Sequence, residues 1–217
     1  MKRESHLFAG HKFFEEAGSQ ILIRLAKVDF RDTKETESLY KQIEDYLITL
    51  EHHARWEEEF IFNKFFTQNE VLSFFGEHTE LENKGKEILA DIKALLHLAP
   101  QSKICKGKQI YLEFRKFYAS NLVHFYEEET HFLSLLQARA TDDEIRAIDK
   151  PIYQNMSSID LVEMIKHLFP PLNISEKKTI LDDLKCYNGT NFNAALSEIR
   201  MMFTSKEAVE VFGVSAP

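Results

Sequence analysis

The chain has 217 residues, of which 44% are hydrophobic and 29% charged, so it can bury a core and is not a disordered chain. Its formal net charge of −8 argues against binding to nucleic acid or to an anionic membrane, because such surfaces need basic partners. Only 7 Gly and 5 Pro occur, which argues against a fold of many strands and favours long helices.

Two further features of composition bear on the compartment. Cys105 and Cys186 are too few for a disulfide framework, which indicates a reducing environment. The N-terminus lacks the apolar run of a signal peptide, and no apolar stretch is long enough to span a bilayer. We therefore expect a cytoplasmic protein without a membrane partner.

Apolar residues recur at helical spacing in the first two thirds of the chain. Asp32 with Glu35, and Thr67 with Glu70, match the pairing of an N-cap with the third helical residue, so each pair predicts a helix start. Ala99 and Pro100 predict a break. The expected long helices cover about residues 5–29, 32–66, 67–97, and from between 102 and 107 to 140.

Short links between long helices force neighbours to reverse direction. We therefore predict an all-α fold, with an up-down-up-down four-helix bundle over residues 1–140 and additional C-terminal helices over 141–217. Thr141 with Glu144 marks the start of this extension as another capping box. Its shorter helices are expected at about 157–169, 174–187, 191–203 and 204–212.

Histidine and glutamate recur four residues apart, once on each predicted long helix. The pairs are His11–Glu15, His53–Glu57, His78–Glu82 and His124–Glu128. Residues at this spacing lie one above the other on a helix face, and the last three pairs are in phase with the apolar residues of their helices. A charged group on a core face is costly unless it is paired or binds a metal. Converging His and Glu side chains in a bundle core predict a dinuclear metal site, with carboxylates bridging two cations and imidazoles as terminal ligands.

The order of these residues resembles the hemerythrin-like family, the HHE cation-binding domain. The resemblance covers roughly residues 5–137. The C-terminal part of the chain is similar to that of longer bacterial members, which have additional helices after the bundle. The segments that carry it are His11-Lys12, His53–Phe62, Glu77–Glu82 and Asn121–Glu129.

The resemblance implies a dinuclear non-haem iron centre with an oxo or hydroxo bridge. Glu57 and Glu128 would bridge the two ions, and His11, His53, His78 and His124 would be terminal ligands. Many family members have a second His where this chain has Glu82. We expect Glu82 to be a ligand, or to accept a hydrogen bond from a ligand His. This more anionic set favours ferric iron or tolerates Mn or Zn, and casts doubt on reversible O₂ carriage.

The predicted function is a metal-binding protein whose iron centre binds or senses O₂ or a related small oxidant. The alternatives are an oxidoreductase acting on peroxide or NO, an iron- or redox-sensing module, and a bundle in which the His–Glu pairs only fix the register. A homodimer or a protein partner through the C-terminal helices stays open.

Several other residues remain alternatives at this stage. His6 is the rival of His11 on the first helix, and Glu15 extends the pattern but has no family counterpart as a ligand. His131 shares the face of His124, as a core residue or a residue that gates the site. Tyr46 lies two turns before His53 and is a candidate donor to a bound small molecule.

Overall fold

A computed structural model of the chain describes residues 6–213, and all regular structure among these residues is helical. The predicted all-α class is confirmed. The chain divides into two compact units. The long-helix unit is Phe14–Ser134, and the short-helix unit comprises the described parts of Met1–Phe13 and Leu135–Pro217.

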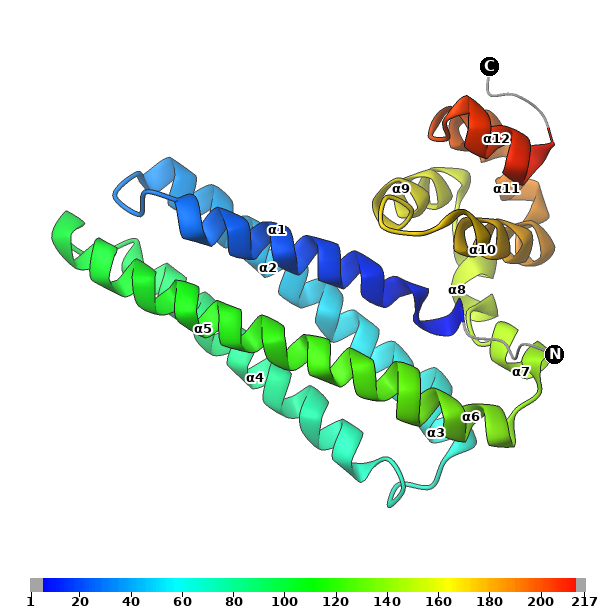
Figure 1. Cartoon of the computed structure of the whole chain (residues 1–217), viewed down its shortest axis with the longest axis horizontal. Coiled ribbons are helices and arrows are strands. Elements are labelled where there is room, and N and C mark those ends of the chain that lie inside the picture. The colour runs from blue at the N-terminus through cyan, green and yellow to red at the C-terminus, as the bar shows by residue number, and fades with distance from the viewer. Residues whose placement is uncertain (1–5, 214–217) are drawn as a thin grey trace. The chain divides into compact units, whose positions relative to one another are not determined.

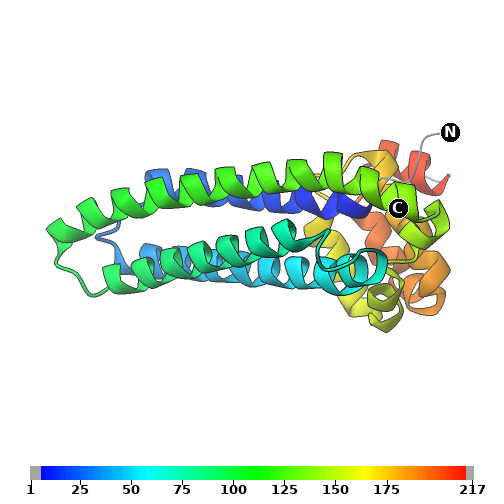
Figure 2. The ribbon, with the colours of Figure 1, turned by 90° about the horizontal axis from the view of Figure 1, so that it is seen from below.

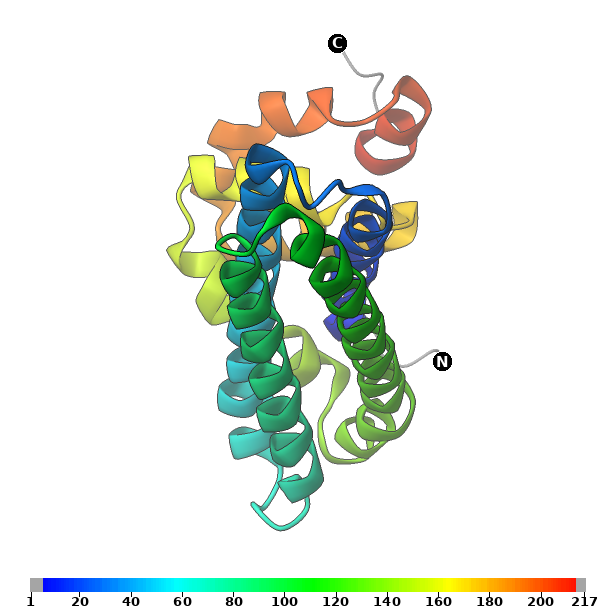
Figure 3. The same cartoon turned by 90° about the vertical axis from the view of Figure 1, so that its left-hand side faces the viewer.

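Four long helices belong wholly or mainly to the long-helix unit: α1 (His11–Lys27), α2 (Thr33–Glu57), α4 (Leu72–Leu95) and α5 (Pro100–Glu127). Two of them continue without a break through a π-helical turn into a short helix. After α2 come η2 (Glu58–Phe62) and α3 (Asn63–Phe65), and after α5 come η3 (Glu128–Phe132) and α6 (Leu133–Arg139). α4 packs against both α2 and α5. The cartoons show α2 beside α4, and α1 beside α5 (Figures 1, 2 and 3).

Apolar side chains fill the space between these helices. Leu39 and Ile43 of α2 are fully buried, as are Ile92 of α4 and Phe114 of α5. Their helical spacing is what the sequence pattern predicts for core faces. This core fixes the depth at which polar side chains of neighbouring helices meet.

One glycine permits a close approach. Gly107 of α5 faces the buried ring of Phe30, and a Cβ atom at this position would lie 2.1 Å from Phe30 Cδ2. Any other residue at position 107 would force the ring to move.

The start of α2 is as predicted, because the Asp32 side chain accepts hydrogen bonds from the backbone N–H groups of Lys34 and Glu35. The start of the third long helix is not. Thr67 and Glu70 do bond to each other, but they close a turn, and α4 begins at Leu72. A capping pair satisfies the same groups in an isolated turn, so the pair alone does not place the helix.

The short-helix unit is built from η1 and the C-terminal helices. Their bounds are η1 (His6–Gly10), α7 (Asp142–Arg146), α8 (Lys150–Asn155), α9 (Ser158–Leu168), α10 (Ile174–Tyr187), α11 (Gly189–Met201) and α12 (Ser205–Phe212). α10 contacts η1, α8, α11 and α12 around a continuous apolar core. Thr141 caps α7 as predicted, and α9, α10 and α12 also begin with capping boxes.

The capping box of α12 is tied to α10 by an ion pair. Lys177 Nζ lies 2.9 Å from Glu207 Oε1, and Glu207 also accepts from the backbone and hydroxyl of Thr204. These contacts lower the pKa of Glu207 to about 2, and the hydrogen bond from Lys177 has the largest effect.

The first described residues, 6–13, group with the C-terminal helices. Ala9 belongs to the apolar core of the short-helix unit, and Lys12 Nζ lies 2.6 Å from Glu176 Oε1. The predicted division placed residues 1–140 together. Across residues 6–213, no helix combines the length and apolarity needed to cross a bilayer.

Candidate metal centre

α2 ends at a His–Glu pair. His53 Nε2 lies 3.2 Å from Glu57 Oε1, and Glu57 is 1% exposed. The spacing of four residues stacks the two side chains on the face of α2 that points into the unit.

An equivalent pair lies where α5 passes into η3. His124 Nε2 lies 3.1 Å from Glu128 Oε1, and the Glu128 side chain is fully buried. Each of these two glutamates stands where α-helix gives way to a π-helical turn, η2 after Glu57 and η3 from Glu128 onward. Such turns are rare and often mark functional sites.

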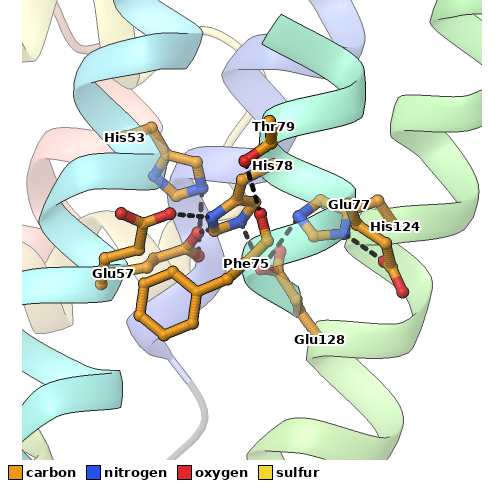
Figure 4. A network of polar contacts seen from close by, with 9 residues as sticks. His53, Glu57, Phe75, Glu77, His78, Thr79, His124 and Glu128 are labelled. Atoms are coloured by element: carbon orange, nitrogen blue, oxygen red, sulfur yellow. Dashed lines mark hydrogen bonds and ion pairs between the residues drawn. The ribbon is translucent and has the colours of Figure 1, made fainter. Parts of the chain in front are cut away.

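His78 of α4 brings the two pairs together. Its Nε2 lies 3.4 Å from Glu57 Oε2 and 3.5 Å from Glu128 Oε1, so one imidazole faces both carboxylates (Figure 4). His53 of α2 and His78 of α4 therefore approach the same carboxylate, Glu57.

The donor atoms form two groups that share both carboxylates. Glu57 and Glu128 meet His78 and His124 in one group, and they meet His53 in the other. Within each group the donor atoms lie within 4.8 Å of one another. Two carboxylates common to two sets of imidazoles are the arrangement that holds a pair of cations with carboxylate bridges.

Outer carboxylates orient two of the imidazoles. His78 Nδ1 lies 3.0 Å from Glu58 Oε1. His124 Nδ1 lies 2.9 Å from Glu77 Oε2 (Figure 4). A ring held by a carboxylate at Nδ1 keeps Nε2 directed at the shared glutamates, and the partner makes that nitrogen a better ligand. This is the usual environment of a metal-bound histidine.

Aromatic rings surround the donors. Phe62 stacks on His78 with ring centroids 5.7 Å apart, and the ring of Phe14 lies 5.0 Å from that of His53. This apolar surround limits water and strengthens every electrostatic interaction inside it.

The buried carboxylates change the acid–base behaviour of the imidazoles. Burial opposes protonation of His78, but the carboxylates of Glu128 and Glu57 outweigh it and raise its pKa to about 10. Burial also opposes protonation of His124, and Glu128 again raises the pKa. Protons on the rings thus offset the carboxylate charge. A bound cation would take over that role and release them.

Comparison with family models places the chain. Residues 3–120 match the family described as "Protein of unknown function (DUF2972)", which is more than half of the chain. The chain belongs to the DUF2972 family. No curated protein and no solved structure matches it.

The DUF2972 match contains His53, Glu57 and His78 but ends before His124 and Glu128. The matched segment therefore holds only part of the donor set that the structure assembles. The complete set needs the last turn of α5 and the first residue of η3.

The prediction that Glu82 is a ligand is not supported, since it joins neither group of donors. Its carboxylate pairs with Lys86 one turn along α4, and its side chain is 38% exposed. Position i+4 from His78 places Glu82 on a similar face but one turn farther from the shared carboxylates. The outer partners of the imidazoles are instead Glu58 and Glu77.

Sequence reasoning does not identify Glu58, because acidic runs such as Glu57–Glu59 are most often solvated, and it assigns no role to Glu77. Their position in the sequence could have identified them, since Glu58 directly follows one predicted ligand and Glu77 directly precedes another. Neighbouring residues on a helix point about 100° apart, so these carboxylates reach a different helix from that of the adjacent ligand.

The remaining candidates lie away from the shared carboxylates. Glu15 is exposed and its backbone carbonyl accepts a hydrogen bond from Tyr118, while His131 is also exposed. The Tyr46 hydroxyl donates to the carbonyl of Phe14. The side chain of His6 lies outside the described residues.

His11 belongs to the short-helix unit and stays a predicted ligand. It is the first residue of α1, its side chain is buried, and its ring stacks on Phe8 with centroids 4.9 Å apart.

Proposed function

We propose that this DUF2972 protein is a hemerythrin-like metal-binding protein. Its long helices would form an up-down-up-down four-helix bundle with additional C-terminal helices. The bundle would hold a dinuclear non-haem iron centre that binds or senses O₂ or a related small oxidant.

One observation carries the proposal: both groups of donors use the same two buried carboxylates, Glu57 and Glu128. A single ion needs only one such group. If the His–Glu pairs only fixed the register of the helices, each glutamate would need to contact only its own histidine. Burying two carboxylates without a cation is also costly.

The donor chemistry fits iron. Imidazole nitrogens with carboxylate oxygens suit Fe and also accommodate Mn or Zn. His53, His78 and His124 would be terminal ligands, and Glu57 and Glu128 would lie between the ions. Such a pair of ions would supply reversible electron transfer and a binding position for a small oxidant. The chain's own residues orient the ligands and limit water.

We include His11 as a further ligand on the basis of its helix. α1 runs without a break from His11 to Phe14, whose ring lies against His53. Residues three apart share a helix face, so His11 lies on the face of α1 that presents Phe14. Removing Glu82 from the set leaves four imidazoles and two carboxylates, which is less anionic than the sequence alone suggested.

Metal analysis tests the proposal. Protein purified aerobically from iron-supplemented cells should contain about two iron ions per chain, as carboxylate-bridged pairs do, with near-ultraviolet absorption of a ferric pair. His78→Ala should lower the metal content, because its ring faces both shared carboxylates. His97→Ala is the matched control, since His97 is exposed near the end of the same helical segment. Equal iron content in the two variants would refute the site.

An oxidoreductase acting on peroxide or NO is the second candidate. It needs a route by which a small molecule reaches the centre, and a cavity of about 340 Å³ lined by His53, His78 and His124 supplies one. Consumption of peroxide or NO by the iron-loaded protein, absent in His78→Ala, would favour this function over sensing.

A further inference from the structure

The cavity beside the donors is far larger than a diatomic oxidant requires. It has a volume of about 340 Å³ and lies within the long-helix unit, lined by residues of α2, α4 and α5. Pockets that hold small organic ligands begin at about 300 Å³, whereas one water takes about 30 Å³. The space therefore suits an organic molecule.

The wall of the cavity is mostly apolar. Leu47 and Leu50 of α2 line it together with Leu81 and Leu89 of α4, and the ring of Phe75 adds an aromatic surface. A ligand in this space would exchange water for hydrocarbon contacts along its body, which favours an apolar molecule.

Its inner end is polar in a limited way. Besides the three imidazoles and the carboxylates of Glu57 and Glu58, the amide of Asn121 lines the cavity, and this residue is 3% exposed. Asn121 Nδ2 donates to the carbonyl of Phe117 at 2.8 Å, so the amide oxygen Oδ1 is left to accept a hydrogen bond. No donor to that oxygen occurs among the described residues. An open acceptor on the wall of a mostly apolar cavity favours a ligand that carries a matching donor.

Charges at the outer end argue against an anionic ligand. Arg55 pairs with Glu51, and Lys86 pairs with Glu82, so both cations that line the cavity are already offset. Glu44 adds a further carboxylate at the wall. A carboxylic acid or phosphate would meet net negative charge, whereas a neutral molecule would not.

We infer that this cavity binds a small neutral organic molecule with an apolar body and one hydroxyl group, of the phenol or alcohol class. The body lies along the leucines and Phe75, and the hydroxyl donates to Asn121 Oδ1 beside the imidazoles. The inference deepens the proposed function, because it names the molecule placed next to the metal centre, but the cavity itself is formed by the chain alone.

Phenol and toluene are the probes, because they have the same shape and differ in the hydroxyl. Binding is measured by calorimetry on the full chain, both iron-loaded and stripped with a chelator. We expect both forms to bind phenol, and phenol to bind more tightly than toluene.

Two variants locate the ligand. Ala54→Leu adds bulk at the cavity wall and should weaken both probes by about tenfold or more. Ala90→Leu, on an exposed position of α4 outside the cavity, is the matched control and should bind as wild type. Asn121→Leu should weaken phenol by about three- to tenfold, the range of one neutral hydrogen bond, and leave toluene unchanged.

Each result separates the cavity from the metal. Phenol binding to stripped protein that refuses iron would uphold the cavity and reject the metal proposal. Two iron ions per chain, without binding of phenol or toluene, would uphold the metal proposal and reject the ligand-binding cavity. Equal effects of Ala54→Leu and Ala90→Leu, or an equal loss of both probes in Asn121→Leu, would overturn the inference. If Ala54→Leu fails to fold, nuclear Overhauser effects between phenol and Leu81 in the wild-type protein decide the location.

Discussion

Glu58→Gln tests whether the outer carboxylates tune the proposed metal site. Glu58 Oε1 lies 3.0 Å from Nδ1 of the buried His78, so the substitution exchanges an ionised acceptor for a neutral amide of the same shape. Loss of such a partner typically costs 10- to 100-fold in metal affinity. Because the Glu58 side chain is 29% exposed, solvent screens part of its charge, and we expect the lower end, about tenfold or 1.4 kcal/mol.

The affinity is measured by competition with a chromophoric chelator. Glu59→Gln is the matched control, since Glu59 is the next residue along the helix and is exposed. Glu77→Gln should cost less than Glu58→Gln, because Glu77 is 45% exposed. An unchanged affinity in Glu58→Gln, with His78→Ala still losing metal, would show that the Glu58 contact does not act on the metal.

Three further predictions concern other parts of the chain. Glu82→Gln should leave the iron content unchanged by metal analysis, and a loss would restore it as a ligand. In denaturant titrations, Gly107→Ala should lower the free energy of unfolding by about 1–3 kcal/mol, because the added methyl group displaces the Phe30 ring. Gly76→Ala is the control, since position 76 has open space around it, and should raise the free energy of unfolding by up to about 1 kcal/mol. The lowered pKa of Glu207 contributes stability above its ordinary value of 4.5 that is lost as pH falls toward 2, so amide exchange in α12 should accelerate across that window in wild type but not in Glu207→Gln.

The fold was predictable where local signals act alone. Asp32 caps its helix as the sequence indicates, because an N-cap needs only the next few residues. Thr67 and Glu70 carry the same signal but close a turn. The hydrogen bonds of such a pair are the same in an isolated turn and at a helix start, so the sequence does not distinguish the two. The grouping of Lys12 with Glu176 had no local signal, because it depends on residues far apart in the chain.

The site was predictable to the extent that helix phase determines it. His53, His78 and Glu57 face one another because each lies in phase with the core positions of its helix. Glu82 shows the limit of the method, since a spacing of four gives the face but not the depth at which a side chain meets its neighbours. The π-helical turns at Glu57 and Glu128 leave no mark in hydrophobic periodicity, so only the structure reveals them.

The contacts around the donors link three helices in sequence. Glu58 of the segment after α2 holds His78 of α4, and Glu77 of α4 holds His124 of α5. Each carboxylate stands next to a residue of the shared set, since Glu58 follows Glu57 and Glu77 precedes His78. Moving one helix would therefore break an outer contact and a donor contact together. At the proposed site, cation binding would for that reason be coupled to the packing of α2, α4 and α5 at this end of the unit.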